Sequence, residues 1–154
     1  MSERHYLKID SPRDALAVLS LKVYEKFGKD ALPLIEEVCS QWGQAIGAKM
    51  GKNLSDNSLG GVGQAFVDSA RSRGSKVEIV EKSGEVFHLK TGEGYRCAMG
   101  LNNTDRQLCG AVMAMDLGIF ESATGKSLKM EILQSMAAND SCCETIYRLK
   151  NVQF

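Results

Sequence analysis

The sequence predicts an α+β domain in which N-terminal helices pack on a mainly antiparallel four-stranded sheet, with one buried central helix. Three observations lead to this class. Apolar residues recur at helical spacing through the first half, short β-branched segments dominate the second half, and one segment between the strand pairs is apolar on nearly every side. The expected order is ααα-ββ-α-ββ within a single domain over residues 1–154, a length that supports one hydrophobic core.

The first half is expected to contain three helices. Ser11 and Pro12 supply an N-cap and a first-turn proline for the first helix, and Gly28 is expected to end it. An apolar stripe predicts a second helix over residues 30–50, and a third is expected over residues 59–73. A polar stretch rich in glycine, asparagine and serine separates these last two helices.

The second half is expected to contribute four strands in two pairs. Ser83 and Gly84 form a two-residue hairpin signal within the first pair. A polar turn that contains Asn139 and Asp140 separates the strands of the second pair. The expected strands are residues 76–82, 85–91, 128–134 and 142–149.

The segment 105–122 is expected to form the buried helix, and Thr104 with Gln107 matches a capping box at its N-terminus. Cys109 and Asp116 share one face of this helix. Their separation of about 10.5 Å lets them contact opposite ends of one small ligand, although they cannot bond to each other. Burying a carboxylate is unfavourable unless it is hydrogen-bonded, so Asp116 is either a satisfied structural acid or a functional group.

Charge and hydropathy exclude several classes of function. The chain has 19 basic and 19 acidic residues, so its formal net charge is +0, which disfavours a nucleic-acid binder that relies on bulk positive charge. Its apolar stretches are far shorter than the ~20 residues of a membrane span. The five cysteines are an odd number, and we expect free thiols in the cytoplasm.

Glycine spacing predicts a close contact between backbones. Gly43, Gly47 and Gly51 fall four residues apart and share one face of the second helix. In a soluble chain this pattern predicts close packing, either inside the domain or across a homodimer.

The cysteines divide into one packing residue and four candidates for a site. Cys39 lies beside an apolar stripe and is expected to be a small buried side chain. Cys97 lies in a loop, Cys109 in the buried helix, and Cys142 and Cys143 at the start of the last strand. Because neighbouring strand residues point to opposite faces, at most one of this vicinal pair is expected to face a given pocket.

These thiols allow two kinds of chemistry. A nucleophilic thiolate needs a nearby base or a lowered pKa. His88 is the candidate base, and Arg96, Arg106, Arg148 or a helix N-terminus could lower the pKa. Thiolates from Cys97, Cys109 and one of the vicinal cysteines could also bind zinc, although the spacing contains no CxxC pair. We expect no other cofactor.

The C-terminal part of the chain resembles the L-2-amino-thiazoline-4-carboxylic acid hydrolase-like family. The stretch LCGAVMAMDLGIFESATGKSLKMEILQSMAANDSCCETIYRL carries the likeness, with Cys109, Asp116, Cys142, Cys143 and Tyr147 at matching places. The segment YEKFGKDALPLIEEVCSQWGQAIGAKM resembles the N-terminal helix pair of that family. The chain departs from the pattern in two places. Its buried helix lacks a preceding Cys-Pro, and its last turn reads Asn-Asp-Ser instead of Gly-Asp-Asp.

The layout is also similar to the 4-vinyl reductase-like (V4R) small-molecule-binding domains, which share their fold with vesicle-tethering Bet3-type proteins. This likeness implies an apolar internal pocket and a homodimer. We expect the partner to be a small-molecule ligand or substrate, not a nucleic acid or a membrane.

Two functions follow from these resemblances. The first is hydrolysis of a small cyclic C–N substrate of the 2-aminothiazoline-carboxylate type, with Asp116 as acid or base. Cys109 or one of Cys142 and Cys143 would then supply the thiol. The alternative is a non-enzymatic V4R-like sensor or carrier that holds an apolar molecule, with or without a Cys-ligated metal. The residues expected to line the substrate site are Arg96, Arg106, His88, Cys97 and the adaptable Met113.

Overall fold

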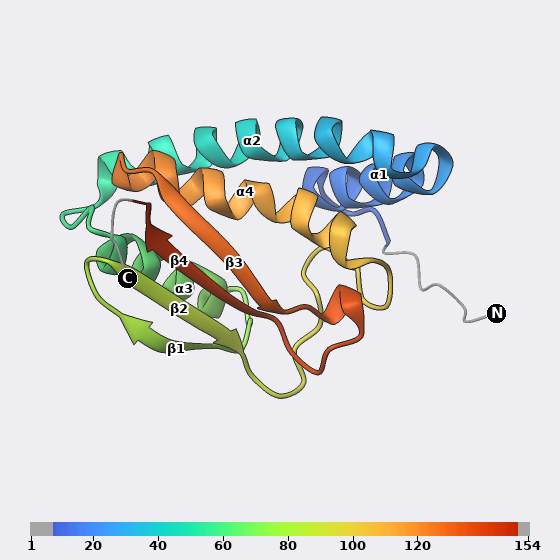
Figure 1. Ribbon diagram of the computed structural model, residues 1–154. Coiled ribbons are helices and arrows are strands. Elements are labelled where there is room, and N and C mark those ends of the chain that lie inside the picture. The colour runs from blue at the N-terminus through green and yellow to red at the C-terminus, as the bar shows by residue number, and fades with distance from the viewer. Residues whose placement is uncertain (1–7, 151–154) are drawn as a thin grey trace.

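A computed structural model describes residues 8–150 and confirms the expected order of elements. A layer of long helices lies over one antiparallel sheet, and a further helix covers the sheet beside β1 and β2 (Figure 1). The elements are α1 (Pro12–Phe27), η1 (Gly28–Ala31), α2 (Leu32–Asn53), α3 (Leu59–Ser72), β1 (Val77–Lys82), β2 (Val86–Thr91), α4 (Arg106–Thr124), β3 (Leu128–Gln134), η2 (Met136–Ala138) and β4 (Glu144–Leu149).

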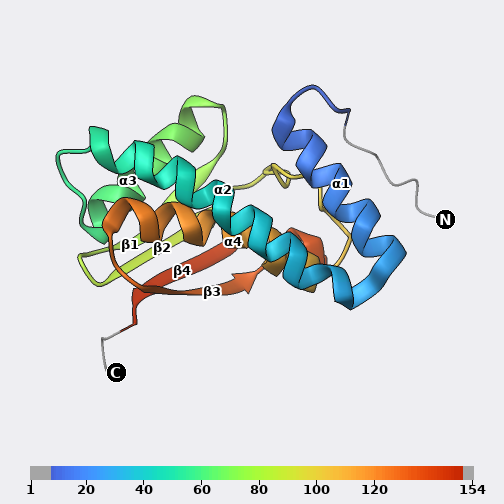
Figure 2. The same cartoon turned by 90° about the horizontal axis from the view of Figure 1, so that it is seen from above.

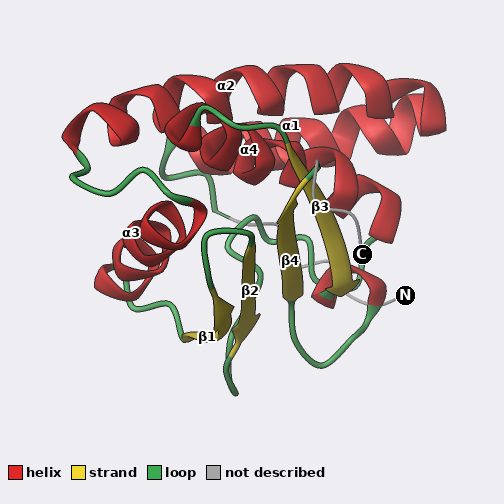
Figure 3. Cartoon of the chain, turned by 60° about the vertical axis from the view of Figure 1, so that its left-hand side comes forward, coloured by secondary structure: helices red, strands yellow, loops and turns green. Residues whose placement is uncertain are grey.

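The last strand occupies an inner position of the sheet. The strand order is β1-β2-β4-β3, and each neighbouring pair is antiparallel (Figure 3). Phe87 and Leu89 of β2 and Tyr147 of β4 are buried against α3 and α4, so they define the inner face. His88 alternates with Phe87 and Leu89 and therefore points to the outer face.

Close backbone contact joins α2 to α4. A side chain at Gly43 or Gly47 would collide with the backbone of Met115 or Ile119 on α4. The contact is reciprocal, because a Cβ atom at Gly118 would lie 2.6 Å from the Ser40 carbonyl oxygen. Seen from above, α2 runs directly over α4 (Figure 2). The glycine spacing is thus used inside the domain, one of the two arrangements it predicts.

The N-terminal boundaries of α4 and β4 differ from the expected ones. Asp105 caps α4 in place of Thr104, and its Oδ1 accepts hydrogen bonds from the Gln107 and Leu108 amides at 2.7 and 3.3 Å. The predicted capping box of Thr104 and Gln107 is therefore not formed, because the Thr104 hydroxyl instead donates to the Leu101 carbonyl. Strand β4 begins at Glu144, so the vicinal cysteines precede the strand.

Two apolar clusters lie on opposite sides of α4, and α4 contributes residues to both. One fills the interface between α1, α2 and α4 and includes the fully buried Leu108 and Cys39. The other fills the space between α4, α3 and the inner face of the sheet. In this second cluster the Phe120 ring stacks on Tyr147, with 4.0 Å between centroids and 8° between ring planes. The predicted burial of the central helix is confirmed, since both sides of it are covered.

Gly43→Ala is expected to destabilise the protein by at least about 1–3 kcal/mol, because the added methyl group would force α2 away from α4. Gly110→Ala is the matched control, since it lies in α4 with nothing within 4 Å of an added Cβ. Helix propensity predicts that this control is neutral or up to about 1 kcal/mol more stable. Urea unfolding measures both, and equal stabilities for the two variants would contradict close packing.

Candidate functional site

Four of the predicted site residues surround the N-terminal half of α4. Cys109 and Asp116 project from α4, Cys97 lies in the segment that precedes it, and Cys143 lies just before β4. Each of the four side chains is partly exposed. Their mutual effects on pKa, described below, show that they lie near one another. The fold thus gathers residues that are far apart in the sequence.

Asp116 is a carboxylate without a polar partner. Among residues 8–150 it makes neither a hydrogen bond nor an ion pair, although Arg13 and Arg73 are near enough to influence its charge. Burial raises its pKa to about 6, and these two arginines lower it only in part. The residue nonetheless keeps part of its surface exposed. Asp116 is therefore largely surrounded by protein without being fully buried.

The thiols beside Asp116 are held in their protonated form. Burial raises the pKa of Cys109, and the Ser135 hydroxyl offsets this effect only in part. Burial also raises the pKa of Cys143 to about 11, even though the Met136 amide donates a hydrogen bond to its Sγ at 3.5 Å. A protonated thiol is a weak nucleophile and a poor metal ligand. The surroundings therefore do not activate these two cysteines.

The vicinal cysteines have different surroundings. The Cys143 thiol faces Cys97 and Cys109, which contribute to its raised pKa. Cys142 is buried, with 7% of its surface exposed. The Thr91 amide donates to the Cys143 carbonyl at 2.9 Å, and the Cys143 amide donates to Thr91 Oγ1 at 2.8 Å. These bonds extend the contact of β2 with the chain before β4 by one position and fix the direction of the Cys143 thiol. Cys39 is fully buried between α2 and α4, as expected.

The site also contains two tyrosines, Tyr95 and Tyr147, that were not among the predicted site residues. Burial, followed by the neighbouring Cys97 and Cys143, raises the pKa of Tyr95 to about 12. Tyr147 is fully buried, and its hydroxyl has no hydrogen-bond partner within the described part of the chain. Burial and then the charge of Asp116 raise its pKa well above the ordinary value. Tyr147 appeared only within the resemblance, and nothing in the sequence marked Tyr95.

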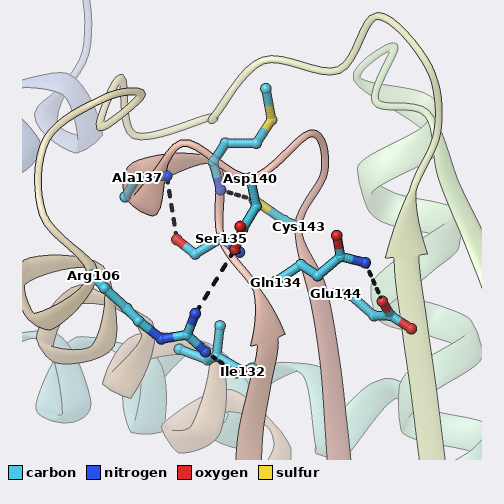
Figure 4. A network of polar contacts seen from close by, with 9 residues as sticks. Arg106, Ile132, Gln134, Ser135, Ala137, Asp140, Cys143 and Glu144 are labelled. Atoms are coloured by element: carbon cyan, nitrogen blue, oxygen red, sulfur yellow. Dashed lines mark hydrogen bonds and ion pairs between the residues drawn. The ribbon is translucent and has the colours of Figure 1, made fainter.

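Arg106 supports the site from its edge and is engaged by other groups. Its Nη2 donates to the Ile132 carbonyl at 2.5 Å, and its Nη1 lies 3.7 Å from Asp140 Oδ2 (Figure 4). The same Asp140 oxygen accepts a hydrogen bond from the Ser135 amide at 2.8 Å. Through these contacts Arg106 links the end of β3 and the β3–β4 connection to the start of α4. Arg96 is exposed in the segment before α4.

His88 is not brought to this cluster, because the sheet lies between them. Its Nε2 is 2.7 Å from Glu144 Oε1 on the outer face, and Gln134 Nε2 donates to Glu144 Oε2 at 2.7 Å. These hydrogen bonds, with Gln134 contributing most, lower the pKa of Glu144. The half-buried Met113 follows Cys109 by four residues, so it lies on the same face of α4.

Other kinds of site find less support. Within residues 8–150, no three His, Cys, Asp or Glu side chains are grouped so that they could hold a metal ion. None of the described helices combines the length and apolar character needed to cross a membrane. An open surface cleft of about 480 Å³ lies between α3, the preceding segment and the β1–β2 turn, away from the thiols. Asp56 already occupies the N-terminal end of α3 there, where Ser58 lowers its pKa.

The fold is shared with proteins that have been solved with small molecules bound. The phenol-responsive sensory domain of the transcription activator PoxR, in complex with phenol, matches with a TM-score of 0.64 and 16% identity, over 92% of this chain and 76% of that one. Trafficking protein particle complex subunit 3 from Naegleria fowleri, covalently bound to palmitic acid, matches with a TM-score of 0.50 and 15% identity, over 92% and 97% of the two chains.

These likenesses confirm the V4R- and Bet3-like layout expected from the sequence. At such low identity they show the fold alone. No family model matches the chain, and no curated protein matches it. Membership of the L-2-amino-thiazoline-4-carboxylic acid hydrolase-like family therefore stays a prediction.

Asp116→Asn is expected to stabilise the protein at neutral pH but not in acid. The folded-state pKa of about 6 lies above the ordinary value of 3.8, so the folded state binds the proton more tightly. The contribution of Asp116 protonation to the free energy of unfolding is therefore fully present below pH ~4 and is lost as the pH rises through ~6. At pH ~7.5 the Asp116→Asn variant should therefore be more stable to unfolding than the wild type by on the order of 2 kcal/mol.

Urea unfolding at pH ~7.5 and pH ~4 tests this expectation. The exposed Asp30, replaced by Asn, serves as the control and should change stability little at either pH. A gain in Asp116→Asn that is equal at both pH values would contradict the burial of an unpaired carboxylate.

Proposed function

We propose that this chain is a small-molecule-binding domain whose ligand contacts α4 through Cys109, Asp116 and Met113. The observation that carries the proposal is Asp116, which is partly exposed, largely surrounded by protein and without a polar partner among the described residues. Binding sites are mostly apolar and contain a few polar groups that orient the ligand. Asp116, with thiols and methionine around it, fits that description.

The comparisons support a binding role for the fold. One similar structure is named as a phenol-responsive sensory domain with phenol, and the other carries palmitic acid. Both molecules are largely apolar, which agrees with the apolar side chains around α4. We propose the same general class of ligand for this chain.

Hydrolysis of a cyclic C–N substrate is the second interpretation. Its support is Asp116, because a carboxyl group with a pKa of about 6 exchanges protons near neutral pH. The raised pKa values of Cys109 and Cys143 argue against a thiolate nucleophile. We therefore rank binding above hydrolysis. Turnover of 2-aminothiazoline-4-carboxylate that is lost in both Cys109→Ala and Asp116→Ala would reverse this order.

Phenol is a suitable first probe, and the wild-type protein is expected to bind it. Cys109→Phe should weaken this binding by at least about tenfold, because the larger ring occupies the ligand's position. Cys97→Phe tests the same space from the connecting segment. His88→Ala is the matched control on the outer face of the sheet and should bind phenol normally.

Calorimetric titration measures the affinities, and circular dichroism shows whether each variant is folded. Folded Cys109→Phe and Cys97→Phe variants that both bind phenol as well as the wild type would refute this location of the site. Loss of binding in His88→Ala would instead place the ligand at the outer face.

We also propose that the chain forms a homodimer through α1 and α2. Leu34 and Val38 are one turn apart on α2 and are 62% and 53% exposed, and Leu19 and Phe27 of α1 are each 59% exposed. Exposed apolar side chains grouped on one helix face are typical of an interface. The homodimer implied by the V4R-like layout would cover them. A cytoplasmic location, expected from the five free thiols, stays a prediction.

Sedimentation equilibrium should show a wild-type dimer that becomes monomeric in the double variant Leu34→Glu, Val38→Glu. Val80→Glu is the control, because Val80 is also 53% exposed but lies on the edge strand β1. A monomeric wild-type protein, or a control that dissociates equally, would contradict an interface on α2.

A further inference from the structure

We infer that Asp116 and Tyr147 together bind a protonated amine, so that the ligand is a small apolar molecule with a cationic nitrogen. This inference rests on the binding function proposed above and specifies the class of ligand. It starts from two polar groups that the described residues leave unsatisfied, one on α4 and one on the facing strand β4.

The first group is the carboxylate of Asp116. With a pKa of about 6 it is mainly ionised at neutral pH, and an unpaired charge surrounded by protein is strongly unfavourable. The two nearest arginines are engaged elsewhere: Arg13 Nε contacts Met99 Sδ at 3.3 Å, and Arg73 Nη1 donates to Ser69 Oγ at 2.6 Å. No described cation therefore pairs with this carboxylate, and a cationic ligand would supply the missing partner.

Four titratable groups around Asp116, two thiols and two phenols, are neutral when protonated. The charge of Asp116 contributes to the raised pKa of each of them, which shows that they lie near it. They come from every side of the carboxylate: Cys39 of α2, Tyr95 of the segment before α4, Cys109 of α4 and Tyr147 of β4. Arg13 of α1 and Arg73 after α3 complete this set. Asp116 is the only carboxylate in this named set.

The second group is the hydroxyl of Tyr147, which is fully buried without a hydrogen-bond partner. The Tyr147 ring stacks on Phe120, and Phe120 follows Asp116 by four residues on the same face of α4. The hydroxyl and the carboxylate therefore belong to the same region between α4 and β4. An ammonium group has three N–H donors, so it can donate to Asp116 and to the Tyr147 oxygen at once.

A cation fits this pair of acceptors better than a neutral donor does. A hydroxyl group could also bridge the two residues, but it would leave the charge of Asp116 uncompensated. Hydrogen bonds between ionised partners are about twice as strong as neutral ones, and the advantage increases where water is excluded. The half-buried Met113, one turn from Cys109 on the same face, would contact the apolar body of the ligand.

Three isosteric probes test the inference: benzylamine, benzyl alcohol and ethylbenzene. The full chain should bind benzylamine at least about tenfold more tightly than the other two, as measured by calorimetry at pH ~7.5. Asp116→Asn should remove this preference, and Tyr147→Phe should weaken benzylamine binding about threefold. Asp68→Asn, an exposed acid on α3, is the matched control and should retain the preference.

Affinity for benzylamine should also decrease as the pH falls below about 6, because protonation of Asp116 removes the charge. Equal binding of benzyl alcohol and benzylamine would overturn the amine inference and leave the proposed binding function standing. Binding of none of the three probes would overturn both. A preference for benzylamine that persists in folded Asp116→Asn would also overturn it, since the cation would then bind elsewhere.

Discussion

The contact between the backbones of α2 and α4 is the constraint on which the rest of the structure depends. Three glycines, Gly43 and Gly47 on α2 and Gly118 on α4, let the two helices approach until backbone meets backbone. Any side chain there would separate the helices, so the contact holds α4 in the interior. The sheet and α3 then cover its other side. The burial of α4 therefore follows from the smallest residues in the chain.

The same burial determines the chemistry of the candidate site. Because α4 is covered on both sides, a charged side chain on it loses water without gaining a protein partner, and the pKa of Asp116 rises to about 6. Burial likewise keeps the thiols of Cys109 and Cys143 protonated. The arrangement thus combines one titratable acid with two thiols whose pKa values are raised. This combination is the basis for the proposal of ligand binding above covalent chemistry.

The sequence predicted the elements well, because apolar periodicity and turn residues are local signals. The shared face of Cys109 and Asp116 followed from their spacing alone. His88 was predicted to line the site, but in the structure it alternates with the buried Phe87 and Leu89 and lies on the outer face of the sheet. Tyr95 and the partners of Arg106 could not be predicted in this way. Their positions depend on contacts between segments far apart in the chain. Every residue has a backbone carbonyl, so the sequence does not show that Arg106 donates to the one of Ile132.

The inner position of β4 has a consequence for how the chain acquires its structure. Both β2 and β3 pair with this strand, and β2 lies more than fifty residues before it. A ribosome must therefore release β4 before the two halves of the sheet can be joined. Until then the β1–β2 hairpin and β3 have no common neighbour, and the Phe120 ring lacks Tyr147 to stack on. Such long-range pairing slows folding, so the sheet is completed late in the biogenesis of this protein.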